Sequence, residues 1–290
     1  MSDLPPDKPC IALMGEFSAG KSTLANLLIG KKHLPEQIIA TQLPPVWLSH
    51  GSDSAHRVDL DGVLHELELT RLDEAPLEST SYIKIFTPQD LLLECDLLDM
   101  PSISDPNMAS EIWQRMLGHA DGVIWCSHAT QAWRQSEAAV WAQQDPALFA
   151  KSILLLTRID KLVNDADRAR VLKRVKRETD GLFRDCLPIS LLHAVNEAEN
   201  PAIWQKSGAE EFARALADLL RDISREKGIE RPSSTATSRS AVLDIPAFVS
   251  QDQEEPAESV SKGDAAAEPV KVMPKRIKLQ RSLRSRSIFE

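Results

Sequence analysis

The sequence predicts an α/β fold with three layers, in which a mostly parallel sheet carries helices on both faces. Three observations predict it. Short apolar runs alternate with longer amphipathic stretches from residue 8 to about residue 227. A glycine-containing segment, residues 15–22, separates the first apolar run from the first amphipathic stretch, and the composition changes abruptly after residue 231. Strand-then-helix alternation of this kind is typical of parallel sheets covered by helices.

The first predicted elements flank the glycine-containing segment. Residues 10–14 form an apolar run of strand length, and residues 21–29 have leucines on one side of a helix. Two further apolar runs, at 82–86 and 91–98, are expected to form a pair of strands joined by a turn at 88–90. This pair would add one antiparallel strand at an edge of the sheet.

The second half of the predicted domain repeats the alternation. Apolar runs of strand length occur at residues 122–126, 152–157 and 187–190. Amphipathic or charged stretches predict helices at residues 136–144, 161–179 and 210–226. We therefore expect one folded domain over residues 8–230.

The C-terminal segments differ from this domain in composition. Residues 231–270 are rich in Ser, Thr, Glu, Ala and Pro, which predicts a disordered linker. Residues 271–290 carry seven Lys or Arg residues and no acidic residue before Glu290, with apolar residues between them. Such a basic segment is either a solvated charge run or a site for an anionic membrane surface or an acidic protein partner.

Composition limits the classes of function. The 290 residues carry a formal net charge of −9, so nucleic-acid binding through bulk charge is not expected. The polar N-terminus has no apolar region of a signal peptide, and no stretch approaches about 20 apolar residues. We expect a cytoplasmic protein, peripheral at the inner membrane surface if the basic segment binds lipid.

The glycine-containing segment matches the phosphate-loop motif G-x-x-x-x-G-K-[ST] at every position, from Gly15 to Ser22. Glycines allow successive backbone N–H groups to point at phosphate oxygens. Lys21 supplies a positive charge for the β- and γ-phosphates, and the Ser22 hydroxyl is a ligand for Mg²⁺. The motif follows a strand and begins a helix, so it predicts the P-loop NTPase fold.

A second motif favours guanine over adenine. Thr157-Arg158-Ile159-Asp160 stands at the end of the apolar strand predicted at 152–156, where the base should lie. Guanine presents two N–H donors on one edge, which the carboxylate of Asp160 can accept together. Asp99 ends another apolar run and is expected to organise Mg²⁺.

These motifs resemble those of the dynamin family of GTPases. Residues 15–23 look like the phosphate loop of bacterial dynamins, and residues 98–102 (Leu-Asp-Met-Pro-Ser) resemble the D-x-P-G motif. Ser102 replaces the glycine of that motif, and Arg158 replaces the lysine of [NT]-K-x-D. Serine keeps its N–H but restricts the backbone, so this departure bears on switching and hydrolysis more than on binding.

Three single residues extend the resemblance, which covers roughly residues 8–225. Thr41, in T-Q-L-P-P-V, matches the threonine of switch I that holds Mg²⁺ and the attacking water. Ser190, in P-I-S, matches a serine near the base, and Ser18 matches a residue that helps to hold a monovalent cation. Dynamin-like proteins normally continue into a helical stalk and a membrane-binding part. Because the residues that follow the GTPase domain here are expected to be disordered, the resemblance does not imply membrane fission.

The resemblance implies Mg²⁺-dependent hydrolysis of GTP to GDP and phosphate, weak until two GTPase domains pair. The implied catalytic residues are Lys21, Thr41 and Ser18, and the implied Mg²⁺ ligands are Ser22, Thr41 and Asp99. The implied nucleotide contacts are Gly15, Glu16, Phe17, Ser18, Ala19, Gly20, Lys21, Ser22, Thr23, Thr157, Arg158, Asp160 and Ser190. Two alternatives remain, namely a GTP-binding recruitment module with little hydrolysis and an ATPase of another P-loop branch.

Overall fold

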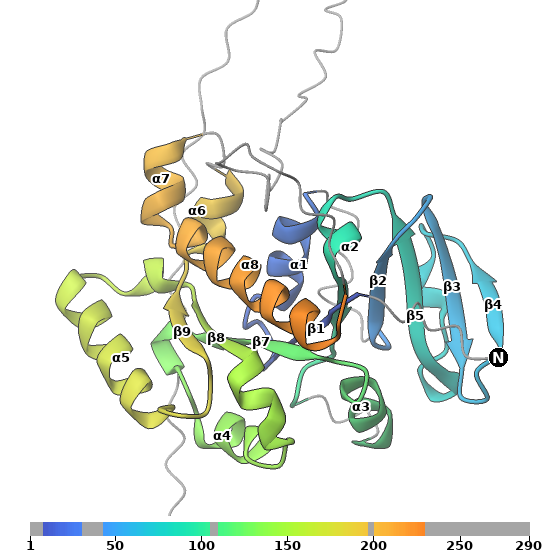
Figure 1. The fold of residues 1–290 in the computed structure, drawn as a ribbon, viewed down its shortest axis with the longest axis horizontal. Helices are drawn as coiled ribbons and strands as arrows, with labels where there is room; N and C mark the ends of the chain where they lie inside the picture. The colour runs from blue at the N-terminus through green and yellow to red at the C-terminus, as the bar shows by residue number, and fades with distance from the viewer. Residues whose placement is uncertain (1–7, 31–42, 105–109, 197–199, 230–290) are drawn as a thin grey trace, which may run out of the picture. The chain divides into compact units, whose positions relative to one another are not determined.

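The computed structural model describes residues 8–30, 43–104, 110–196 and 200–229 (Figure 1). The chain divides into two units, Met1–Val249 and Ser250–Glu290, and every described residue belongs to the first. The linker and basic segment predicted at 231–270 and 271–290 lie outside the described residues, as does Thr41. Within the described ranges, no helix is both long enough and apolar enough to span a bilayer.

The described residues form a sheet of nine strands in the order β4-β3-β5-β2-β6-β1-β7-β8-β9. The strands are β1 (Cys10–Gly15), β2 (Val46–His50), β3 (Ser54–Asp59), β4 (Leu64–Leu67), β5 (Thr80–Thr87), β6 (Asp96–Asp99), β7 (Gly122–His128), β8 (Ser152–Thr157) and β9 (Asp185–Pro188). From β6 to β9 every pairing is parallel. Beyond β6, β2 pairs antiparallel with β6 and parallel with β5, while β3 pairs antiparallel with both β5 and β4.

Helices cover both faces of the sheet (Figure 1). They are α1 (Lys21–Ile29), α2 (Leu91–Glu94), α3 (Ser110–Leu117), α4 (Gln135–Trp141), α5 (Asp165–Glu178), α6 (Leu191–Asn196), α7 (Pro201–Lys206) and α8 (Ala209–Glu226). Alternate residues of β1 enter two separate apolar clusters. Ile11 and Leu13 pack with residues of α1, α2, α6 and α8, whereas Ala12 and Met14 pack with residues of α3, α4 and α5. This alternation confirms the predicted three-layer α/β fold.

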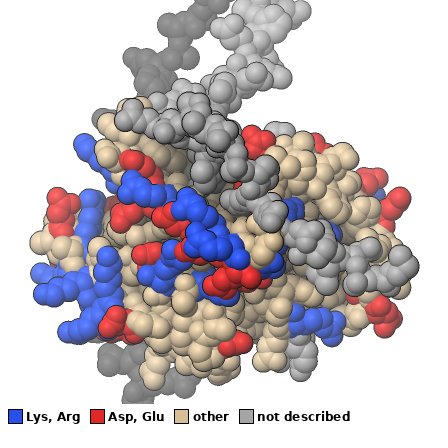
Figure 2. All heavy atoms as spheres, viewed as in Figure 1, with Lys and Arg blue, Asp and Glu red and all other residues tan. Residues whose placement is uncertain are grey.

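The outer side of α8 is a mixed-charge surface. Arg214, Arg221 and Arg225 each pair with an acidic residue three or four positions away on the same helix. Figure 2 shows Lys and Arg beside Asp and Glu on this face of the molecule. The inner side carries buried apolar residues at helical spacing, such as Phe212 and Leu216.

The predicted pair of strands at 82–86 and 91–98 is wrong. Strand β2 lies between β5 and β6, and residues 91–94 form α2 instead of continuing a strand. A short apolar run does not distinguish a strand from a buried helical turn, and Leu91 and Leu92 are buried in α2. The antiparallel edge strand exists, but it is β4.

Strands β2, β3 and β4 were not predicted. Strands β3 and β4 carry charged and half-buried residues rather than a continuous apolar run. The predicted helix at 161–179 begins later, at Asp165, because the Asn164 side chain accepts a hydrogen bond from the Asp167 N–H (2.8 Å) and caps it.

Candidate functional site

The phosphate loop connects β1 to α1 and has the backbone that its motif requires. Gly15 has φ 140° and Gly20 has φ 95°, values that favour glycine. A Cβ on Gly15 would lie 2.1 Å from the carbonyl oxygen of Cys126 on β7. The loop therefore passes so close to the neighbouring strand that only glycine fits at its first position.

Lys21 begins α1 and lies buried beneath this loop. Its Nζ donates hydrogen bonds to the carbonyl oxygens of Gly15 and Glu16, both at 3.1 Å. Burial lowers the pKa of Lys21, and the nearby carboxylate of Asp99 opposes that shift. The ammonium group is thus fixed inside the curve of the loop, where the motif places the phosphates.

Ser22 and Asp99 place two side-chain oxygen groups next to Lys21. The Ser22 hydroxyl donates to Oδ2 of Asp99 at 3.2 Å. Burial raises the pKa of Asp99 to about 6, and Lys21 and the Ser22 hydrogen bond act against it. Oδ1 of Asp99 is buried without a hydrogen-bond partner among the residues that the structure describes. A hydroxyl and a carboxylate with a spare oxygen suit a hard cation such as Mg²⁺.

The base-recognition motif is joined to the phosphate loop by Thr157. Its buried hydroxyl donates to the carbonyl oxygens of Ala19 (2.7 Å) and of Ser127 on β7 (3.3 Å). Ser190, which follows β9, donates from Oγ to Oδ1 of Asp160 at 2.7 Å. The structure thus brings together the phosphate loop, Asp160 and Ser190, which the sequence analysis assigns to one nucleotide site.

Arg158, between Thr157 and Asp160, has a left-handed backbone with φ 54° and an exposed side chain. Its side chain is long enough to lie along a base bound beside Asp160.

The remaining predicted residues lie at the rim of the loop. The Phe17 side chain is 68% exposed at the tip of the loop, and Ser18 has a left-handed backbone with φ 58°. Thr23 is exposed in the first turn of α1.

Ser102 follows the strand that carries Asp99. Its hydroxyl lies 2.9 Å from Oγ of Ser104 and accepts a hydrogen bond from the Ser104 N–H at 3.3 Å. Among the described residues other than glycine, positive φ occurs at Ser18, Trp133 and Arg158. Ser102 therefore adopts an ordinary backbone conformation here.

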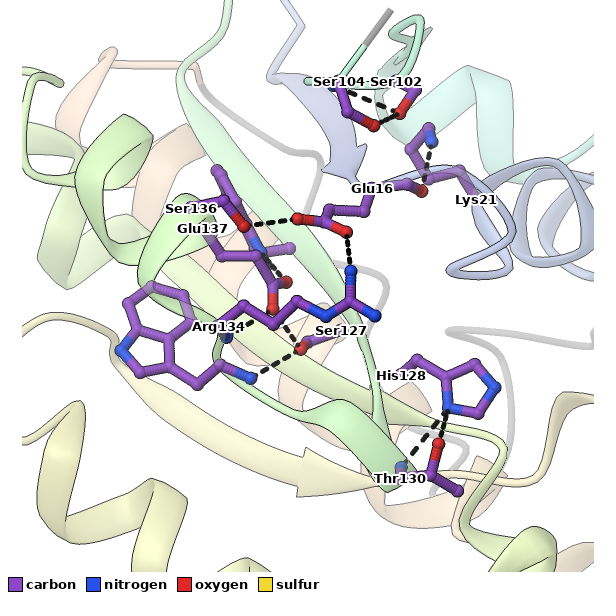
Figure 3. A network of polar contacts seen from close by, with 12 residues as sticks. Glu16, Lys21, Ser102, Ser104, Ser127, His128, Thr130, Arg134, Ser136 and Glu137 are labelled. Carbon is purple, nitrogen blue, oxygen red and sulfur yellow. Dashed lines mark hydrogen bonds and ion pairs between the residues drawn. The ribbon is translucent and has the colours of Figure 1, made fainter. Parts of the chain in front are cut away.

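Sequence reasoning missed a polar network on the other side of the loop (Figure 3). The Glu16 carboxylate accepts from Nη1 of Arg134 (2.8 Å) and from Oγ of Ser136 (2.5 Å), both at the start of α4. Below them, the buried carboxylate of Glu137 accepts from Trp125, Ser127 and the Arg134 N–H. Glu137 lies three residues after Arg134, which is the spacing of the glutamate in a capping box. This spacing is the one local signal that could have drawn attention to the segment.

Comparison with protein-family models identifies the family of this chain. The sequence model of the Dynamin family matches residues 11–159. Dynamin-like protein 2 of Campylobacter jejuni is 26% identical over 227 residues, covering 76% of this chain and 36% of that protein. The isoniazid-induced protein IniC of Mycobacterium tuberculosis is 28% identical over 254 residues, covering 74% of this chain and 50% of that protein.

A solved structure described as an oligomerised bacterial dynamin pair has the same fold. It aligns with a TM-score of 0.55 and 20% identity, over 76% of this chain and 37% of its own. The chain thus spans about a third to a half of the relatives that it matches. Because the family model covers half of the chain and includes the phosphate loop, Asp99 and Thr157, the protein belongs to the dynamin family and carries its GTPase domain.

Proposed function

We propose that this protein binds GTP with Mg²⁺ and hydrolyses it to GDP and phosphate. The observation that carries the proposal is the grouping of Lys21, the Ser22–Asp99 pair and the Asp160–Ser190 pair around one loop. Catalysis in such a site is mainly positioning and electrostatic stabilisation. Lys21 neutralises charge on the β- and γ-phosphates, and the N–H groups of residues 15–22 orient them.

Ser22 and Asp99 would hold the metal ion, together with Thr41 as the family resemblance implies. A bound Mg²⁺ would supply positive charge that neutralises the charge developing on the transferred phosphate. Thr41 orients the attacking water. Ser18, at the rim of the loop, is proposed to help hold a monovalent cation that compensates charge in the same way.

Asp160 accounts for the choice of guanine. Its carboxylate can accept both N–H donors of the guanine edge, while Ser190 holds Oδ1 of that carboxylate at 2.7 Å. Arg158 covers the flat face of the base. An ATPase of another P-loop branch would use none of these three residues, so competition between GTP and ATP separates the two.

We further propose that two GTPase domains pair to reach full activity. Phe17 is exposed on the loop that would face a second domain across the nucleotide. The sequence offers no obvious general base for the attacking water, so we expect turnover by one domain alone to be weak. A solved relative of the same fold is itself an oligomerised bacterial dynamin pair.

The basic segment at 271–290 is proposed to contact an anionic membrane surface or an acidic protein partner. That solved relative is also described as providing a mechanism for the sensing and tethering of membranes. Because the proposed substrate is a cytoplasmic nucleotide, we place the protein in the cytoplasm, peripheral at the inner membrane surface.

The second candidate function is a GTP-gated recruitment module with little hydrolysis. Ser102 favours it, because serine in place of the family's glycine restricts the backbone of a loop that must move during turnover. The two candidates separate when GTP binding and phosphate release are measured on the same preparation. Binding with turnover that Lys21→Ala abolishes supports the GTPase, and binding without turnover supports the module.

A further inference from the structure

Glu16 places a carboxylate beside the phosphate site. Its carbonyl oxygen is 3.1 Å from Nζ of Lys21, so its backbone forms part of the phosphate cradle. Its side chain leaves in another direction and meets Arg134 and Ser136 at 2.8 and 2.5 Å (Figure 3). Two donors from a segment more than one hundred residues away thus hold this carboxylate.

The segment that supplies these donors is held in place by its own contacts. Glu137 accepts three hydrogen bonds, from Nε1 of Trp125 (3.0 Å), Oγ of Ser127 (3.0 Å) and the Arg134 N–H (2.9 Å). Trp133 adopts a left-handed backbone with φ 56°, which is costly for a residue with a large side chain. Its N–H donates to Oγ of Ser127 at 3.0 Å, so the strained turn is itself tied down.

A free carboxylate at Glu16 would oppose nucleotide binding. The phosphates of GTP are strongly anionic, and the Glu16 carboxylate is near enough to Lys21 to act electrostatically on its ammonium group. Its negative charge would therefore also repel phosphates bound at Lys21. The Glu16 side chain is 19% exposed, so water screens its charge only in part. Arg134 places an opposite charge directly on it.

We propose that Arg134, with Ser136, is a positioning residue that neutralises Glu16 and holds it against α4, so that the loop can accept a triphosphate. The inference rests on the proposed function, because it concerns the same nucleotide site. Arg134 acts on the nucleotide only through Glu16. Its loss therefore harms binding only while Glu16 keeps its charge.

The test measures GTP and GDP affinity of the full chain by titration with fluorescent nucleotides. We expect Arg134→Ala to weaken GTP binding by about five- to tenfold, and GDP binding less, because GDP carries less negative charge. In the double variant, Glu16→Gln added to Arg134→Ala should return GTP affinity to within about twofold of the wild type. Arg134→Lys should keep most of the affinity, because it restores the charge.

Arg170→Ala is the matched control, since Arg170 forms an exposed ion pair with Asp167 on α5. It should change affinity by less than about twofold. Urea denaturation of each variant verifies that the fold is retained.

Two results would overturn the inference. If Arg134→Ala binds GTP as the wild type does, the pair is only a surface ion pair. If Arg134→Ala and the double variant are equally weak, Arg134 contacts the nucleotide itself. A different pair of results would overturn the proposed function, and this inference with it. These are a wild-type protein that binds no nucleotide, or a Lys21→Ala variant that binds nucleotide as tightly as the wild type.

Discussion

At the scale of single residues, three charged groups of the site have partners that fix their directions. Ser190 holds the Asp160 carboxylate, Ser22 holds that of Asp99, and two carbonyl oxygens hold the ammonium of Lys21. These bonds fix the directions of side chains that would meet a bound nucleotide.

Replacing Asp160 tests the choice of base. Asp160→Ala removes two charge-assisted hydrogen bonds to guanine, together worth about 3 kcal/mol or a factor of about 100 in GTP affinity. Competition titrations should show that ATP affinity is almost unchanged. The control Asp165→Ala, at a highly exposed carboxylate on α5, should leave both affinities as they are. Equal losses for the two nucleotides would contradict the role of Asp160.

Ser102 can be tested by restoring glycine. Its side chain restricts the loop after Asp99 by about 0.5–1 kcal/mol relative to glycine, so Ser102→Gly should raise the rate of phosphate release about two- to fivefold. GTP affinity should stay within about twofold. Ser102→Ala removes the hydroxyl but keeps the Cβ, and it should turn over at the wild-type rate. A rate unchanged in Ser102→Gly would show that this position does not limit turnover.

At the scale of elements, the segment between β7 and α4 links the aromatic core to the phosphate loop. Trp125 and Trp141 pack edge to face at 5.4 Å within the apolar cluster below it. Glu137 is the buried acceptor that ties this segment to β7. Burial raises the pKa of Glu137. The hydrogen bonds from its three donors lower that pKa, and the bond from Trp125 lowers it the most.

Removing Glu137 should destabilise the protein. Glu137→Ala leaves the donors of Trp125, Ser127 and Arg134 without their acceptor, which costs about 3 kcal/mol. Urea denaturation of the full chain measures this loss. Glu178→Ala on α5, which removes an exposed ion pair with Arg174, should cost less than about 1 kcal/mol. Similar losses in the two variants would mean that the Glu137 network contributes little.

The sequence could predict those parts of the site that one local motif contains. Residues 15–22, Asp99 and Asp160 are recognisable because each follows an apolar run at a fixed place. The Glu16–Arg134 contact was not predictable, because it joins residues 118 positions apart that only the fold brings together. The central parallel strands were predicted from their apolar runs, whereas β3 and β4 lack that signal because they are half-exposed.

At the scale of the whole molecule, the account requires two GTPase domains to meet. Phe17 is the exposed aromatic residue on the phosphate loop, and we expect a second domain to cover it. Phe17→Ser should remove most of the rise in specific activity with protein concentration. GTP affinity should stay within about twofold, because the phosphate loop contacts the nucleotide through backbone N–H groups that the substitution keeps. Val63→Ser is the control, because Val63 is similarly exposed but lies at the hairpin of β3 and β4, far along the sheet from β1. If both variants behave as the wild type, the phosphate loop is not part of the pairing surface.

The most direct test of the central claim is phosphate release by the full chain, with GTP or ATP, over a range of protein concentrations. The account predicts release from GTP alone that rises more than linearly with concentration and disappears in Lys21→Ala. Tight GTP binding with no Lys21-dependent release at any concentration would contradict it.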